Sequence, residues 1–220
     1  MIREHIKSGD YIDWLKSLGC LVYLPLSADG DLQDRISGLS LQLTGQGSMV
    51  WDGNQQRYKL TTPSQNNSHT AILPNGLTKS NFPDNRVTIL QGIKKVTSSS
   101  SKYLRAFCVN STNYDTTDVF NCGYNGTSRS NGFPASEVYL GFTINASIDR
   151  SYYQNGSLFG TYSPHNPYLP SNWVLNGSGV IIGNTTGSTS FTNVQLYISE
   201  LYIFNNVLDL ATIRKIQGYE

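Results

Sequence analysis

The chain has little charge and few of the side chains that most often carry out catalysis. Charged residues make up 14% of its 220 residues, and its glutamates are limited to Glu4, Glu137, Glu200 and Glu220. No strand can therefore carry two glutamates on one face as a catalytic acid and nucleophile. Gly-x-Ser-x-Gly, P-loop and His-Glu-x-x-His motifs are absent as well. We predict from these absences that the protein is not an enzyme.

Neither sign of charge dominates, and no long apolar run occurs. The net charge is +1, and no basic cluster is longer than a pair such as Lys94-Lys95, so we expect no nucleic-acid partner. No stretch reaches the roughly 18 consecutive apolar residues of a membrane span, which argues against membrane insertion. The first 19 residues carry scattered charges and lack the apolar core of a signal peptide. We expect cytoplasmic synthesis, with a virion or surface appendage as the destination, or secretion if a signal was removed.

Cysteine is also scarce. Cys20, Cys108 and Cys122 are an odd number at wide spacing, without a Cys-x-x-Cys or Cys/His metal pattern. We interpret them as buried free thiols.

Short apolar runs separated by turn residues account for most of the chain. Ser, Thr, Asn, Gly and Tyr are abundant, a mixture typical of strands joined by many turns. Asn155-Gly156 stands between two aromatic-rich arms and predicts a hairpin. The sequence therefore predicts an all-β fold. The expected strands are Cys20–Leu26, Leu39–Leu43, Arg57–Leu60, Val87–Ile93, Tyr103–Val109, Val119–Cys122, Val138–Ile144, Arg150–Gln154, Ser157–Tyr162, Val180–Ile182 and Val194–Phe204.

Two short helices are expected, one near each end of the chain. Asp10 as N-cap and Gly19 as a stop predict a helix over Tyr11–Leu18. Asp209 as N-cap and Gly218 as a stop predict a second helix, with basic residues in its last turn.

The strand before the second helix changes phase. Leu196 and Ile198 share one face, whereas Leu201 and Ile203 fall on the other by simple alternation. The slip near Ser199-Glu200 indicates a bulge or a strand covered on both faces. The helix that follows is expected to bury Ile213 and Ile216.

Three blocks of the sequence carry a family resemblance. They are "CLVYLPLSADGDLQDRISGLSLQLTG", with a D-x-SG turn, "RSYYQNGSLFG", and "SELYIFNNVLDLATIRKI". Together they resemble a laminin-G-like domain of the concanavalin A-like lectin/glucanase superfamily, in its bacterial and phage form. The pattern is interrupted by a polar insertion between Leu60 and Thr88.

The resemblance implies a fold for the whole chain. It is a single concanavalin A-like domain over residues 1–220, a two-sheet antiparallel jelly-roll sandwich with residues 1–19 as a helical lead-in. The first and last strands of such a domain pair, and a short terminal helix packs beside them. Laminarinase-type enzymes of the superfamily carry a Glu-x-Asp-x-Glu strand that this chain lacks, and the position of Glu200 implies support of a turn or a salt bridge.

Metal binding is left open by the sequence. Asp29, Asp31 and Asp34 offer carboxylates, which suit calcium, and many relatives bind calcium at a loop rim. Their spacing is not that of an EF-hand, and the Ser-Gly dipeptide that follows is typical of a turn. A polar turn and a calcium site are the two interpretations, and no other cofactor is expected.

The segment "GTYSPHNPYLPSNW" is the candidate ligand-binding loop. Its prolines stiffen the backbone, and aromatic faces stack on sugar rings. Trp173 and Tyr168 are the predicted platform, with His165 and Asn166 as polar partners and Tyr162 beside them. The alternative is that these aromatic residues pack down onto the sandwich.

The sequence supports two classes of function. One is a non-catalytic, lectin-like carbohydrate-binding module that recognises a glycan or cell-surface polysaccharide. The other is a structural or adhesive protein of a phage tail or surface appendage, whose partners are other subunits of an assembly.

Overall fold

The computed structural model describes residues 9–43, 47–61, 70–74, 77, 79–82, 84, 86–95, 104–109, 121–123, 138–144, 150–162, 180–185 and 195–219. In these ranges the chain forms antiparallel strands, two α-helices and a 3-10 turn. The elements are α1 (Gly9–Ser17), β1 (Cys20–Leu24), β2 (Ser48–Asp52), β3 (Arg57–Thr61), β4 (Ala71–Leu73), η2 (Lys79–Asn81), β5 (Val87–Lys95), β6 (Leu104–Val109), β7 (Asn121–Gly123), β8 (Val138–Ile144), β9 (Arg150–Gln154), β10 (Ser157–Tyr162), β11 (Val180–Thr185), β12 (Gln195–Phe204) and α2 (Leu210–Gln217).

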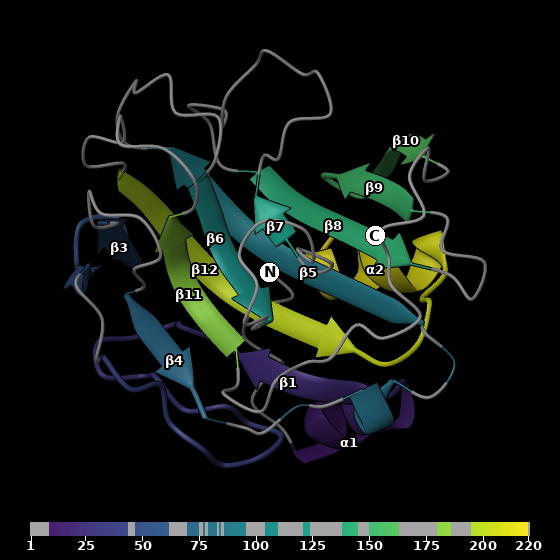
Figure 1. Cartoon of the computed structure of the whole chain (residues 1–220), viewed down its shortest axis with the longest axis horizontal. Coiled ribbons are helices and arrows are strands. Elements are labelled where there is room, and N and C mark those ends of the chain that lie inside the picture. The colour runs from purple at the N-terminus through teal and green to yellow at the C-terminus, as the bar shows by residue number, and fades with distance from the viewer. Residues whose placement is uncertain are drawn as a thin grey trace.

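The strands form two stacked antiparallel sheets. The larger has eight strands in the order β10-β9-β8-β5-β12-β3-β2, with β1 also paired to β12, and the smaller has the order β4-β11-β6-β7. The smaller sheet lies in front of the long strands β5 and β12 (Figure 1). The predicted all-β fold with antiparallel sheets and two short helices is therefore confirmed.

The last strand lies at the centre of the larger sheet because it pairs on both sides. One edge of β12 pairs with β5, and the other pairs first with β3 and then with β1. Cys20 of β1 lies opposite Phe204 of β12, so the expected pairing of the first and last strands is confirmed.

The phase slip in β12 is a bulge. Ile198 lies opposite Ile93 and Leu201 lies opposite Gln91, which leaves Ser199 and Glu200 facing the single residue Gly92. The extra residue returns Leu201 and Ile203 to the same face as Ile198, and all three side chains are fully buried. That inner face of the larger sheet packs toward the smaller sheet.

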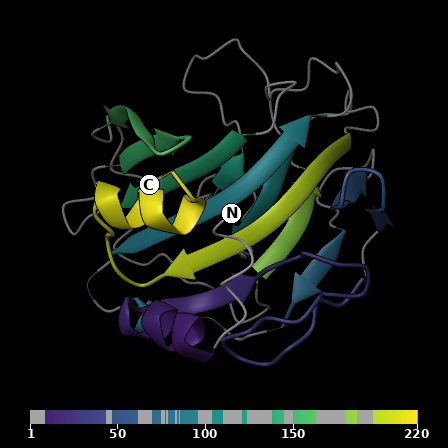
Figure 2. The ribbon, with the colours of Figure 1, turned by 180° about the vertical axis from the view of Figure 1, so that it is seen from behind.

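The two helices cover the opposite face of the larger sheet, which we call the outer face (Figure 2). Their buried residues join side chains from the outer faces of β1, β5 and β12 in one cluster. The cluster consists of Leu15, Cys20, Tyr23, Leu90, Tyr202, Phe204, Leu208, Ile213 and Ile216. The helices are thus part of the core, and the expected burial of Ile213 and Ile216 is confirmed. Neither described helix is long enough to cross a membrane.

The ends of α2 follow the local sequence signals. The carboxylate of Asp209 accepts a hydrogen bond from the backbone N–H of Thr212, and Gly218 takes the left-handed conformation that closes the helix. At α1 the expected N-cap is displaced, since the helix already includes Asp10 in its first turn. Gly19 ends that region with a φ of 84°, as predicted.

The hairpin predicted at Asn155-Gly156 is confirmed, whereas one predicted strand is not formed. Asn155 and Gly156 both have positive φ, the conformation of a type I′ turn, and they join β9 to β10. The strand expected over Leu39–Leu43 is wrong. That segment forms two single bridges, at Ser40 and Gln42, because its backbone bonds partly to the turn before it and partly to Ile72 of β4.

Candidate ligand-binding surface

The helices leave one end of the outer face uncovered. Seen from behind in Figure 2, α1 and α2 lie toward one side, and no described helix overlies the region where β5 ends and β12 begins beside β3. Tyr197 of β12 pairs with Lys59 of β3 on one side and with Lys94 of β5 on the other. We call these three residues the Tyr197 row. Val50 of β2 extends it at the sheet edge and is 60% exposed.

A carboxylate holds the hydroxyl of the central tyrosine. Tyr197 donates a hydrogen bond of 2.6 Å to the Oδ2 atom of Asp52, at the end of β2. This bond is the largest cause of two opposite shifts: it lowers the pKa of the Asp52 carboxyl and raises the pKa of the Tyr197 phenol. Both residues are partly exposed, so the bond orients the ring without removing it from solvent.

The ammonium group of Lys94 lies beside the same ring. Its Nζ atom is 5.9 Å from the centroid of Tyr197 and donates a 3.0 Å hydrogen bond to the side-chain oxygen of Gln55. That amide is neutral, so this hydrogen bond does not offset the charge of Lys94. In the described part of the chain, neither Lys59 nor Lys94 forms a salt bridge within 4.0 Å.

The described groups of this surface are suited to binding a ligand rather than to reacting with it. It offers an oriented aromatic ring, two cationic donors, a carboxylate acceptor and an amide, all from the end of the sheet between β2 and β5. Aromatic rings flanked by planar polar groups suit ligands that combine C–H faces with hydroxyl groups.

The tyrosines at the helix-covered end are arranged differently. The rings of Tyr23 and Tyr202 stack with centroids 4.5 Å apart, and the Tyr202 hydroxyl donates a 2.9 Å bond to Glu200. Burial is the main reason that the pKa of Tyr11 rises to about 12 and that the pKa values of Tyr23 and Tyr202 are raised as well. Glu200 thus accepts from a buried tyrosine beside the bulge, a supporting position.

The predicted binding loop contributes little to the described structure. Trp173, Tyr168, His165 and Asn166 lie outside the described residues. Tyr162 is the last residue of β10, where its backbone pairs with Arg150. Four of these five residues therefore lie outside the described part of the chain, and the role of all five stays a prediction.

The aspartate-rich segment forms a turn. Asp34 is fully buried, and its carboxylate accepts bonds from the backbone N–H groups of Tyr23, Ile36 and Ser37 and from the Ser37 hydroxyl. Asp31 pairs with Arg35 and accepts from the Ser27 hydroxyl. No group of three metal-ligating side chains occurs among the described residues. Asp34 faces the backbone of its own turn, as the polar-turn interpretation expects, and the calcium site stays a prediction.

Comparison with known proteins places the fold. A scan against models of protein families gives no match, and a search of curated proteins gives none either. Solved structures do match. A structure of botulinum neurotoxin type C, whose cell uptake depends on interaction with two ganglioside molecules, is 15% identical with a TM-score of 0.60, over 93% of this chain and 52% of its own.

Two further neurotoxin structures give the same result. The binding domain of botulinum neurotoxin DC in complex with rat synaptotagmin II matches with a TM-score of 0.62 at 15% identity, over 91% of this chain and 51% of its own. The same domain in complex with SialylT gives 0.59 at 15% identity, over 91% and 51%. The chain thus shares the fold of about half of each neighbour, a β-rich part of a receptor-binding protein.

Sequence reasoning did not single out the Tyr197 row. One signal was present: alternation along β12 places Tyr197 on the face opposite Leu196 and Ile198. The other two residues come from strands far away in the sequence, so only the strand register brings Lys59 and Lys94 to either side of the ring.

Proposed function

We propose that this protein is a non-catalytic, lectin-like module that binds glycans. The observation that carries the proposal is the Tyr197 row, an oriented, partly exposed aromatic ring between two lysines on a sheet face that no described helix covers, and neither lysine forms a salt bridge within the described part of the chain. Aromatic faces pack on the C–H groups of sugar rings, and the neighbouring charged and amide groups are suited to hydroxyls. The ganglioside and SialylT named with the structural neighbours agree with a glycan as the partner.

The described carboxylates support a role without catalysis. Glycoside hydrolysis needs a pair of carboxyl groups about 5–10 Å apart across the scissile bond. Asp34 is committed to its turn, Asp31 to Arg35, and Glu200 to Tyr202. We therefore propose no hydrolase activity. The laminin-G-like assignment remains the family that we propose for this fold.

A glycan array probed with the pure full-length chain tests the proposal. We expect reproducible binding to at least one class of neutral or acidic glycan, and no release of reducing sugar when the bound glycans are incubated with the protein. Absence of binding to every glycan would overturn the proposal and favour a structural subunit of a phage tail or appendage. Release of reducing sugar would overturn the non-catalytic part alone.

Two variants of the predicted loop locate the site. If Trp173 is the platform, Trp173→Ala should weaken glycan binding by about tenfold or more, the scale of one lost stacking contact. Trp173→Phe keeps an aromatic ring and should retain most of the affinity. Full-strength binding by Trp173→Ala would remove the loop as the platform and leave the Tyr197 row as the site.

A further inference from the structure

We infer that the Tyr197 row binds an acidic sugar, one that carries a carboxylate on its ring or side chain. The inference rests on the proposed function and adds to it a ligand class and the two lysines that would recognise that ligand. It is drawn from the register and charges of Lys59, Tyr197 and Lys94, and it does not use the predicted loop.

The spacing across the row suits one sugar. Lys59 and Lys94 belong to the two strands that flank β12, so their backbones lie about 10 Å apart, twice the distance between neighbouring strands. Tyr197 lies between them on the same face. A sugar ring against the tyrosine therefore has an ammonium group within reach on either side, and each ammonium carries three donors for a carboxylate.

The charge around the row favours an anion. Lys59, Lys94 and Arg57 contribute three positive charges and Asp52 one negative charge, a formal sum of +2 on a chain whose total is +1. Arg57 donates to the backbone oxygen of Gln55 and supports the turn between β2 and β3. Lys59 and Lys94 are both partly exposed and therefore accessible to a ligand, while Lys59 also helps to lower the Asp52 pKa and Lys94 donates to Gln55.

Asp52 limits the kind of anion. Its carboxylate already accepts the Tyr197 hydroxyl, and the bonded form keeps its negative charge because its pKa is lowered. Such a charge repels ligands with closely spaced anionic groups, such as nucleic acids, yet it accepts hydrogen bonds from hydroxyls. A sugar with one carboxylate and several hydroxyls fits this mixture better than a dense polyanion.

The test compares matched ligands that differ by a carboxylate. Titration calorimetry of the full-length chain would use sialyllactose against lactose, and a galacturonic acid oligomer against the same length of galactose oligomer. We expect the acidic member of at least one pair to bind more tightly, and increasing salt to weaken that binding. The two pairs separate a sialic acid from a uronic acid as the source of the carboxylate.

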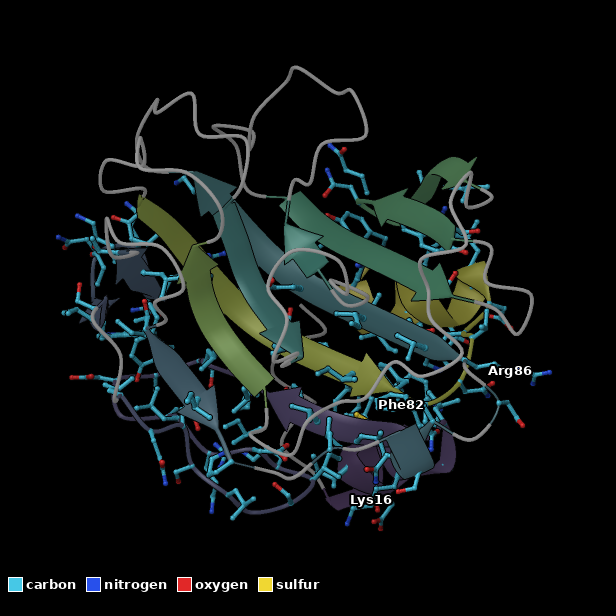
Figure 3. The ribbon with its side chains drawn as sticks, viewed as in Figure 1. Lys16, Phe82 and Arg86 are labelled. Atoms are coloured by element: carbon cyan, nitrogen blue, oxygen red, sulfur yellow. The ribbon has the colours of Figure 1, made fainter. Side chains whose placement is uncertain are left out.

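Variants place the binding on the row. Lys59→Gln combined with Lys94→Gln replaces both charges with neutral polar groups on side chains one atom shorter, and should lose about tenfold in affinity for each charged hydrogen bond removed. The control is Lys16→Gln combined with Arg86→Gln. It removes the same total charge from exposed residues away from the Tyr197 row: Lys16 belongs to α1, and Arg86 precedes β5 at the end of that strand opposite to Lys94 (Figure 3). The control should bind like the wild type, and melting curves should show that both proteins fold.

The outcomes separate this inference from the proposed function. Binding of neutral glycans alone would overturn the acidic-sugar inference and leave the glycan module standing. Acidic binding that survives in the Lys59/Lys94 variant, or that falls equally in the control, would overturn the location. Equal binding of nucleic acid would overturn the ligand class. No binding to any glycan would overturn both proposals.

Discussion

The two ends of the outer sheet face are built from the same strands but carry opposite kinds of side chain. At the covered end, β5 and β12 present Leu90, Tyr202 and Phe204 to the helices, and each is at most 1% exposed. At the uncovered end, the same two strands present Lys94 and Tyr197, which are partly exposed. The face changes from core to surface along its length because the helices cover only part of it.

The difference shows how one residue type serves two purposes. Tyrosine at the covered end is a packing residue whose pKa rises mainly because burial disfavours the phenolate. Tyrosine at the uncovered end has its pKa raised mainly by the bond to Asp52. The first tyrosine stabilises the helix interface, and the second orients a ring toward solvent.

Truncation of a buried side chain of α2, at the covered end of the outer face, should have the largest effect on stability. Ile213 is fully buried in the cluster between α2 and the sheet. Ile213→Ala should lower the free energy of unfolding by about 2–5 kcal/mol, because it leaves a cavity in that cluster. Denaturant unfolding followed by circular dichroism measures the change.

A neighbouring residue of α2 is the control for this substitution. Leu210 is 38% exposed, so Leu210→Ala should change the stability much less than Ile213→Ala does. Equal effects of the two variants, or no effect of Ile213→Ala, would show that α2 does not belong to the core.

Local signals predicted much of this arrangement. The strands β8, β9 and β10 begin and end at the predicted residues, since an Asn-Gly turn and two aromatic-rich arms specify a hairpin within a short stretch. The bulge was also readable, because one extra residue shifts the phase of every apolar side chain after it.

Other elements depended on partners that the sequence does not reveal. The alternating leucines of residues 39–43 suggested a strand, yet Leu39 and Leu43 are 39% and 52% exposed while Leu41 is buried. Leu41 donates its N–H to the carbonyl of Leu32 in the preceding turn, whereas Gln42 exchanges two backbone bonds with Ile72 of β4, so the backbone is shared between a turn and a sheet edge and forms no continuous ladder. The edge strand β2 was missed because it carries Met49 and Val50 on opposite faces, which hides the alternation.

The boundary between the two ends should be sensitive to one methyl group. A Cβ atom at Gly92 would lie 1.9 Å from the Ser199 Oγ atom and 3.2 Å from a ring carbon of Tyr139. Gly92→Ala should therefore lower the free energy of unfolding by about 1–3 kcal/mol, the usual range for overpacking. Thermal and denaturant unfolding both report this change.

A double-mutant cycle identifies the contact responsible. The Ser199 Oγ atom is buried with no hydrogen-bond partner among the described residues, so Ser199→Ala should be nearly neutral. In that background Gly92→Ala should be less costly, because the nearest atom is gone. Strictly additive effects would mean that the hydroxyl turns away and that the bulge tolerates a side chain opposite it.

The smallest effect on stability is expected when the Tyr197 hydroxyl, at the uncovered end of the outer face, is removed. The Asp52 pKa is lowered in the folded chain, chiefly by the Tyr197 hydroxyl. A carboxyl with a lowered folded pKa adds stability above its unfolded pKa, and that stability is lost as the pH falls through the folded pKa. Tyr197→Phe should therefore raise the Asp52 pKa, measured by NMR titration, and slightly reduce stability at neutral pH. The stability curves of variant and wild type should converge in acid.

The same substitution at the covered end completes the comparison. Tyr202→Phe removes a buried hydroxyl that contacts Tyr11 at 3.4 Å and donates to Glu200. The partners left behind are partly desolvated, which typically costs about 1–3 kcal/mol. Tyr202→Phe should therefore destabilise the protein more than Tyr197→Phe at pH 7. Equal losses would mean that the two tyrosines do not differ in kind, and that Tyr197 is a structural residue and not a ring held ready for a sugar.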